Sequence, residues 1–264
     1  MMADMSSNQD KSSGSTDATS DVSEALPAAS HRGPHPSDRK TFLPESVHGV
    51  ANAVADLGHL LTREYGRESA LKLVGDRYRL TARQRVAVDR MTCSDSQLHS
   101  RIGRERSDLR GASVVIDGFN LLTTVEAALG GALILDCRDT CYRDMAGTGG
   151  SYRVVAETVP AMDVIGAVLR EAGVVQTRVV LDQPVQNSGR VKALWAESLA
   201  KAKLGYEIQI ANGVDGLLRE SPDVVVSADS EVIDACMCWS SLARRIVQTR
   251  IPTAWVLGTT PSSK

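Results

Sequence analysis

Aromatic residues are scarce in this chain of 264 residues, in which Phe, Trp and Tyr together make up only 4%. Val, Ala and Leu must therefore fill any hydrophobic core, and the hydrophobic content of 42% is high enough to form one. The chain also lacks an apolar run of the roughly 20 residues needed to cross a bilayer. Its N-terminus is polar and carries no secretory signal. These absences exclude a membrane-embedded or secreted protein and predict a cytoplasmic one.

Net charge is small as well, at −2, which argues against a protein that coats nucleic acid over its whole surface. A local basic face is not excluded by so small a total. The five cysteines lack the spacing of a secreted disulfide framework and fit reduced thiols in a cytoplasm. A zinc site is not favoured, because Cys236 and Cys238 fall in a predicted helix, where their side chains would point roughly 200° apart.

Three regions of the chain differ in composition and pattern. Residues 1–40 are dominated by Ser, Asp, Ala, Gly and Thr, with almost nothing that could be buried, and are predicted to be a disordered tail. Residues 41–110 have helical periodicity. Residues 111–264 alternate between short apolar runs and amphipathic segments, which is typical of an α/β domain. The sequence therefore predicts a tail, a small helical segment and one α/β domain.

The helical segment is rich in arginine from Arg63 to Arg110. An apolar stripe at residues 47–61 predicts its first helix, and Thr81 with Gln84 forms a capping box that opens a later one. A serine N-cap, Ser94 or Ser96, opens the last. The arginines suit a phosphate-binding face, because a guanidinium can grip a phosphate with two hydrogen bonds. A solvated helical surface with local ion pairs is the equally weighted alternative.

The α/β domain is expected to contain a mostly parallel sheet with helices on both faces, as a three-layer α/β/α fold. One long helix is expected from Asp229 to about Arg245, and residues 137–153 are expected to form a loop. Strands are predicted at residues 114–116, 132–135, 178–181, 206–210, 224–226 and 255–257.

Aspartates follow several of these predicted strands. The stretch VVIDGFN, residues 114–120, runs from a strand into Asp117, and other strands are followed by Asp182, Asp215 and Asp229. Because ligands bind beyond the carboxyl ends of parallel strands, these carboxylates are expected to share one edge. Oxygen ligands of this kind suit Mg²⁺ or Mn²⁺, which activate water and clamp phosphodiesters. Each aspartate by itself is equally consistent with a helix N-cap.

The stretches VVIDGFN and DVVVSADSEVID resemble the PIN-like nuclease superfamily, in particular its NYN-type branch. This resemblance covers about residues 111–261. The whole layout, including GDRYRLTARQRVAVDR before the domain, also looks like an uncharacterised prokaryotic family that joins a helical N-terminal segment to such a domain. The resemblance implies that Asp117, Asp215 and Asp229 bind the metal and that Asn120 orients the substrate or a metal-bound water. The sequence departs from the family in two places. The last strand, WVLGTTP, has no acid, and the central helix has GVDGLL where the family more commonly has Ala-Asp-Asp.

This resemblance implies a Mg²⁺- or Mn²⁺-dependent nuclease, in particular an endoribonuclease with RNA as its partner and no membrane association. The alternative is a catalytically inactive PIN-like module that binds nucleic acid or a nucleotide. Candidate substrate-binding residues are Arg138, Arg143, Ser188, Arg190, Ser227 and Ser230. Possible additional acids are Asp139, Asp144, Asp182 and Asp234. For the loop residues and for Ser188, internal ion pairs and an ordinary helix cap are the alternatives.

Overall fold

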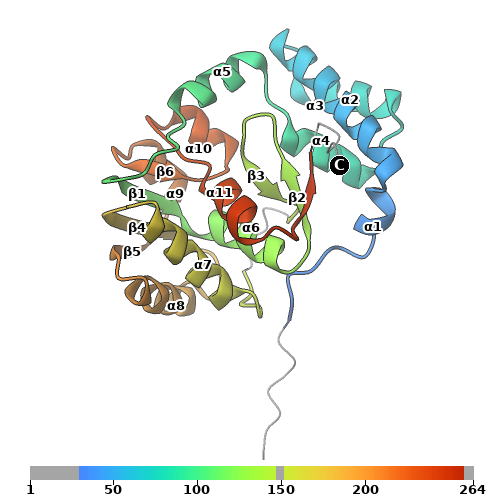
Figure 1. Cartoon of the computed structure of the whole chain (residues 1–264). Coiled ribbons are helices and arrows are strands. Elements are labelled where there is room, and N and C mark those ends of the chain that lie inside the picture. The colour runs from blue at the N-terminus through green and yellow to red at the C-terminus, as the bar shows by residue number, and fades with distance from the viewer. Residues whose placement is uncertain (1–29, 147–151, 259–264) are drawn as a thin grey trace, which may run out of the picture.

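A four-stranded parallel sheet forms the centre of the α/β part of the molecule (Figure 1). The computed structural model describes residues 30–146 and 152–258. The strand order is β5-β4-β1-β6, so the strand that carries VVID lies inside the sheet, and every pairing is parallel. These strands are β1 (Ser113–Asp117), β4 (Gln176–Asp182), β5 (Gly205–Ala211) and β6 (Val224–Val226). The predicted α/β fold with a parallel sheet is confirmed.

A second sheet of three short strands lies beside the first, in the order β3-β2-β7. Its members are β2 (Leu133–Asp136), β3 (Tyr142–Asp144) and β7 (Trp255–Leu257). The prediction of a loop at residues 137–153 is wrong over β3, which returns antiparallel to β2. All three residues of β3 are buried, but its sequence YRD is polar and therefore gave no apolar strand pattern. The predicted last strand exists as β7, but it pairs with β2.

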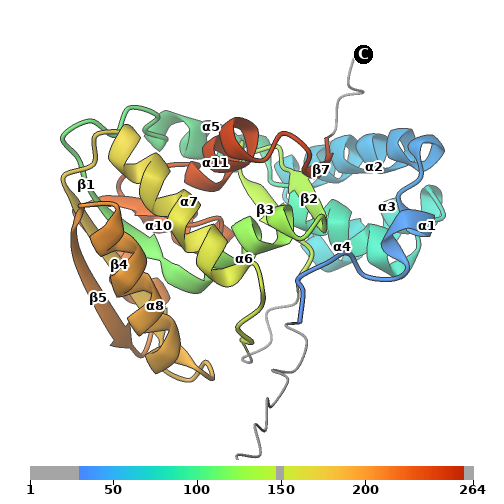
Figure 2. The ribbon, with the colours of Figure 1, turned by 60° about the horizontal axis from the view of Figure 1, so that its bottom comes forward.

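Helices cover both faces of the main sheet (Figure 2). Because successive strand residues point to opposite faces, Val114 and Ile116 pack among α6, α7, α8 and α11, whereas Val115 packs toward α9 and α10. The helices of this part are α6 (Gly118–Leu129), α7 (Thr158–Glu171), α8 (Ser188–Lys201), α9 (Val214–Arg219), α10 (Ser230–Ala235) and α11 (Leu242–Arg250).

The predicted long helix after Asp229 is in fact two helices, α10 and α11, separated by residues 236–241. Trp239 causes the break: its backbone bridges to Val225 of β6 and to Glu105, and its side chain is fully buried. Its indole N–H donates to the carbonyl of Arg101 at 2.8 Å. The chain gives up helical hydrogen bonds there because Trp239 is held by β6. Cys236 and Cys238 consequently do not lie in a helix.

The helical segment is a layer of the same molecule and shares its core. Val54, Leu57 and Val88 belong to one apolar cluster with Leu133 and Val115 of the two sheets. Both capping boxes are present, at Thr81 with Gln84 and at Ser94 with Gln97. The helices are α1 (Asp38–Thr41), α2 (Pro44–Thr62), α3 (Arg67–Arg77), α4 (Ala82–Met91) and α5 (Asp95–Arg104). Across the described residues, no helix is both long and apolar enough to pass through a bilayer.

Several arginines of this segment are paired with acids. Arg67 bonds Asp89 at 2.7 Å, and Arg85 bonds Asp76 at 2.8 Å. Arg83 grips the buried carboxylate of Asp38. These pairs favour the interpretation of the segment as an ion-paired surface over that of a phosphate-binding face.

The predicted disordered tail is too long at its C-terminal end, because residues 30–32 contact the α/β domain and helix α1 begins at Asp38. Arg32 pairs with Glu126, whose side chain is fully buried, and lies over the ring of Tyr152. His31 bonds Glu157 at 2.8 Å. A buried carboxylate is costly without a partner, so Glu126 holds the segment in place. Residues 1–29, the rest of that predicted tail, lie outside the described residues.

Candidate functional site

Asp117 ends β1 and caps α6, and its carboxylate is almost fully buried. Its Oδ1 accepts the backbone N–H of Asn120 at 3.3 Å, and its Oδ2 accepts the hydroxyl of Ser227 at 2.9 Å. Burial raises the pKa of Asp117 to about 7, against the effect of both hydrogen bonds. The carboxyl group is therefore close to half-protonated at neutral pH, and a cation that bound there would displace the proton.

Asn120 and Ser227 tie the ends of β1 and β6 together. The Oδ1 of Asn120 accepts the backbone N–H of Ala228 at 2.9 Å. The hydroxyl oxygen of Ser227, which donates to Asp117, accepts the N–H of Asp229 at 3.0 Å. Asn120 and Ser227 thus hold the side chain of Asp117 and the backbone beside Asp229 in position.

Asp229 caps α10 with one of its oxygens. Its Oδ1 accepts the N–H groups of Glu231 at 2.8 Å and Val232 at 3.2 Å. No hydrogen bond reaches its Oδ2 from the described residues. The cap and ligand interpretations of this aspartate are therefore compatible, because only one oxygen is used by the helix.

Asp182 and Asp215 complete an acidic group at the carboxyl edge of the main sheet. Burial raises the pKa of Asp117, of Asp182 and of Asp215, and neighbouring charges add to each shift. The charges of Asp182 and Asp215 raise the pKa of Asp117, that of Asp215 acts on Asp182, and that of Asp229 acts on Asp215. The charges of the predicted acids thus act on one another, and a divalent cation bound among them would offset their repulsion.

The chemistry of these donors fits Mg²⁺ or Mn²⁺, because all of them are carboxylate oxygens. Their spacing is looser than a finished metal centre: within residues 30–146 and 152–258, no three His, Cys, Asp or Glu side chains converge on one point that could hold an ion. Asp215 has a side chain that is 58% exposed and lies at 4.0 Å from Arg219. It is the acid with the most freedom to turn inward.

Arg138 and Arg143 are engaged inside the protein. Arg138 donates to the carbonyl of Cys93 and to Asp95, and so connects the loop after β2 to the start of α5. Arg143, on β3, is buried and pairs with Asp139. The contacts match the alternative of internal ion pairing, and they leave the assignment of both arginines to substrate binding without support.

The possible additional acids, apart from Asp182, also have internal partners. Asp139 lies between Arg143 and Arg101, both of which donate to it. Asp144 accepts the hydroxyl of Thr124 at 3.0 Å, and Asp234 accepts the guanidinium of Arg101. Asp139 and Asp234 are therefore counterions of buried arginines.

The hydroxyl candidates divide by their contacts. Ser188 donates to the carbonyls of Asp182 at 2.8 Å and Val185 at 2.6 Å, so its hydroxyl closes the loop before α8. Ser230 meets Arg143 at 3.4 Å. Arg190, in the first turn of α8 after the Asp182 strand, is exposed. Among the predicted substrate-binding residues, Arg190 is thus an exposed cation, whereas Arg138 and Arg143 are engaged in ion pairs.

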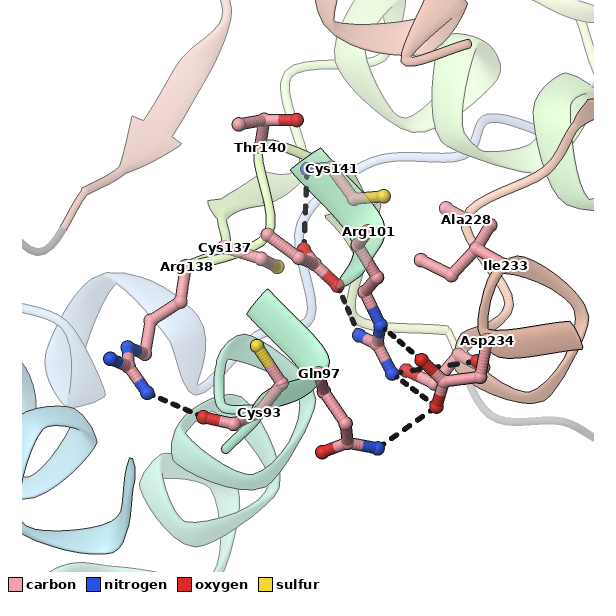
Figure 3. A network of polar contacts seen from close by, with 12 residues as sticks. Cys93, Gln97, Arg101, Cys137, Arg138, Thr140, Cys141, Ala228, Ile233 and Asp234 are labelled. Carbon is pink, nitrogen blue, oxygen red and sulfur yellow. Dashed lines mark hydrogen bonds and ion pairs between the residues drawn. The ribbon is translucent and has the colours of Figure 1, made fainter. Parts of the chain in front are cut away.

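Arg101 was not among the residues that sequence reasoning singled out. Its side chain is almost completely buried, and Figure 3 shows it pointing at Asp234 with Cys93 and Cys137 nearby. Burial raises the pKa of both thiols, so they remain protonated. Nothing in the arginine-rich pattern distinguishes Arg101 from its exposed neighbours. The apolar pattern of its helix does not mark it either, because Ile102 is about half exposed whereas Arg101 is buried.

Comparison with known proteins gives two adjoining family matches. A family described as "Domain of unknown function (DUF5616)" matches residues 106–245, which is more than half of the chain. One described as "Protein of unknown function (DUF434)" matches residues 50–104. The uncharacterised protein MJ0935 of Methanocaldococcus jannaschii is 28% identical over 186 residues, which cover 70% of this chain and 88% of that protein. No solved structure matches the chain.

Proposed function

The chain belongs to the DUF5616 family, and we propose that it is a divalent-metal-dependent nuclease with a PIN-like domain. It hydrolyses phosphodiester bonds, as an endoribonuclease, at the acidic carboxyl edge of the main sheet. The cofactor is Mg²⁺ or Mn²⁺ and the substrate is RNA. The choice of RNA over DNA rests on the resemblance to the NYN-type branch of the PIN-like nucleases.

The observation that carries this proposal is the placement of four aspartates at the end of, or just after, each of the four parallel strands, with the buried Asp117 among them. Asp117, Asp182, Asp215 and Asp229 are far apart in the sequence, and yet the charges of neighbouring members raise the pKa of three of them. A fold gains no stability from like charges gathered beside a buried carboxyl group. Such an arrangement is typical of sites that bind a cation or a developing positive charge.

The residues of the chain have distinct tasks in this proposal. The carboxylates of the edge would hold a divalent cation, and that cation would supply an activated water and offset charge on the phosphodiester. Asp117 presents a carboxyl group that Ser227 and the N–H of Asn120 keep in one orientation. Asp229 offers the oxygen that does not cap α10. Arg190 stabilises the negative charge that the phosphate gains during attack.

A second candidate function is a binding module of the same fold that has lost catalysis. Two observations favour it. The described residues hold no ready group of three metal ligands, and β7, which has no acid, lies in the second sheet. In this second candidate function, the acidic edge of the main sheet binds RNA or a nucleotide without cleaving it.

The test is Mn²⁺-dependent cleavage of single-stranded and structured RNA, with matched DNA strands, by the full chain. Asp117→Asn is expected to abolish cleavage, and Asp163→Asn, which removes an exposed carboxylate on α7, is expected to leave it unchanged. Equal cleavage by wild type and Asp117→Asn would refute the proposal. RNA binding without cleavage under any metal would establish the binding module instead.

A further inference from the structure

The turn at residues 228–230, which presents Asp229, is fixed by contacts from several directions. The N–H of Ala228 is held by Asn120, as described above. The carbonyl of Ala228 accepts the Nε–H of Arg143 at 2.7 Å. The carbonyl of Ser230 accepts an Nη2–H of Arg101 at 3.4 Å. The carbonyl groups of the residues before and after Asp229 are thus bound by guanidinium groups.

The two guanidinium groups share one counterion. Arg143 donates to both oxygens of Asp139, from Nη1 to Oδ1 at 2.9 Å and from Nη2 to Oδ2 at 2.7 Å, and Arg101 also donates to Oδ2. Burial acts to raise the pKa of Asp139, but Arg143 and Arg101 outweigh it and hold that pKa below its usual value. Because Asp139 is ionised between them, Arg101 and Arg143 form a single buried unit.

Arg101 also reaches past the turn to the helix that Asp229 caps. Its Nε and Nη2 donate to the two oxygens of Asp234 on α10, at 2.6 and 2.7 Å (Figure 3). A guanidinium that binds both carboxylate oxygens fixes the direction of the side chain as well as its distance. Arg101 therefore fixes α10 near its end, while its contact with Ser230 fixes the start.

Arg101 comes from α5, in the part of the chain that matches the other family, DUF434. The remaining partners, Asp139, Arg143 and Asp234, all come from the part that matches DUF5616. Without α5, the α/β domain would lose the cation that joins the buried Asp139 to the partly exposed Asp234. The helical segment consequently supplies a component of the edge without contributing any candidate ligand.

We propose that Arg101 is a positioning residue that sets Asp229 for metal binding, and that the α/β domain needs the helical segment to form a working site. The metal part rests on the proposed function. Asp139, Arg143 and Asp234, which the sequence suggested as acids or substrate contacts, are the framework through which Arg101 acts. Replacement of such supporting partners typically lowers metal affinity about 10–100-fold.

Two substitutions in the full chain test this role. Arg101→Met removes the guanidinium and keeps much of the side-chain volume. Arg67→Met is the matched control. Arg67 belongs to the same segment and also pairs with an acid, Asp89, but the side chain of Arg67 is 43% exposed. Mn²⁺ affinity, measured from the electron paramagnetic resonance signal of the free ion, is expected to fall at least about tenfold in Arg101→Met. It is expected to stay unchanged in Arg67→Met.

A double-mutant cycle separates positioning from general damage. If Arg101 acts through Asp229, Arg101→Met has no further effect on Mn²⁺ affinity in an Asp229→Asn background. An equally large effect in that background would overturn the proposal. Arg101→Lys covers the case in which Arg101→Met does not fold, because it keeps a cation beside Asp139 but cannot bind Asp234 with a planar fork. It is expected to fold and to show a smaller loss of affinity.

Hydrogen exchange provides a readout that needs no metal. The amides of Asp229, Glu231 and Val232 all donate within the turn and its cap, and they are expected to lose protection in Arg101→Met but not in Arg67→Met. Unchanged protection would refute the positioning role. If wild type takes up no Mn²⁺, the proposed function fails, while the exchange data still decide whether Arg101 holds the turn.

Discussion

Asp117→Asn is expected to make the metal-free protein more stable above pH 7. The reason lies in the cost of ionising a buried carboxyl group. The pKa of Asp117 is raised from 3.8 to about 7 in the folded protein. Each pKa unit corresponds to about 1.4 kcal/mol, so full ionisation of Asp117 lowers the free energy of unfolding by about 4 kcal/mol.

The direction of the pH effect follows from proton binding. Between pH 3.8 and 7 the folded state keeps the Asp117 proton while the unfolded state has released it. Stability contributed by the neutral group is therefore complete below about pH 4 and is lost as the pH rises to 7. Asparagine never ionises, so the variant lacks this loss. It can also keep the contact with the N–H of Asn120 through its amide oxygen.

The assay is urea unfolding with a chelator present, at pH 5 to 9, for wild type, Asp117→Asn and Asp163→Asn. The stability gap between Asp117→Asn and wild type is expected to widen from pH 5 to pH 8, up to about 4 kcal/mol. Parallel pH profiles for these two proteins would refute the reasoning. In excess Mn²⁺ at pH 8 the order is expected to reverse, because only the wild-type site gains stability from binding.

Two further predictions concern the neighbours of Asp117. Gly118→Ala is expected to destabilise the protein by about 1–3 kcal/mol, because its Cβ would lie 2.9 Å from the carbonyl oxygen of Val180. Gly49→Ala, in the open middle of a helix, is expected to gain up to about 1 kcal/mol, and thermal unfolding compares the two. Asn120→Ala frees the N–H of Ala228 and is expected to cost about 1–3 kcal/mol and to reduce RNA cleavage. Asn120→Ala with wild-type activity would separate this residue from the site.

Periodicity predicted most of the elements that surround the acidic edge. The run VVID is a buried parallel strand, as its pattern predicts, because Val114, Val115 and Ile116 have β-branched side chains that suit burial on both faces. Asp182 and Asp229 were expected on the same edge, and their charges do reach the other acids there. A regular pattern over a parallel sheet determines which ends meet, so this much follows from sequence alone.

The parts that could not be predicted depend on long-range contacts between polar residues. Arg143 and Asp144 look like loop residues, but they form a buried strand because Asp139 and Thr124 satisfy them. The break before α11 depends on Trp239 meeting a strand that precedes it in the chain. Local propensity carries no information about such partners, since they are chosen by the tertiary fold.

Arg101 and Trp239 meet across 138 residues of chain, and this has a consequence for synthesis in the cell. At about 5–20 residues per second, α5 leaves the ribosome on the order of ten to thirty seconds before its partner. Through that interval the guanidinium of Arg101 also lacks Asp234, which is made only shortly before Trp239. The helix α5 is therefore expected to take its final place against the α/β domain only after this late part of the chain has been made.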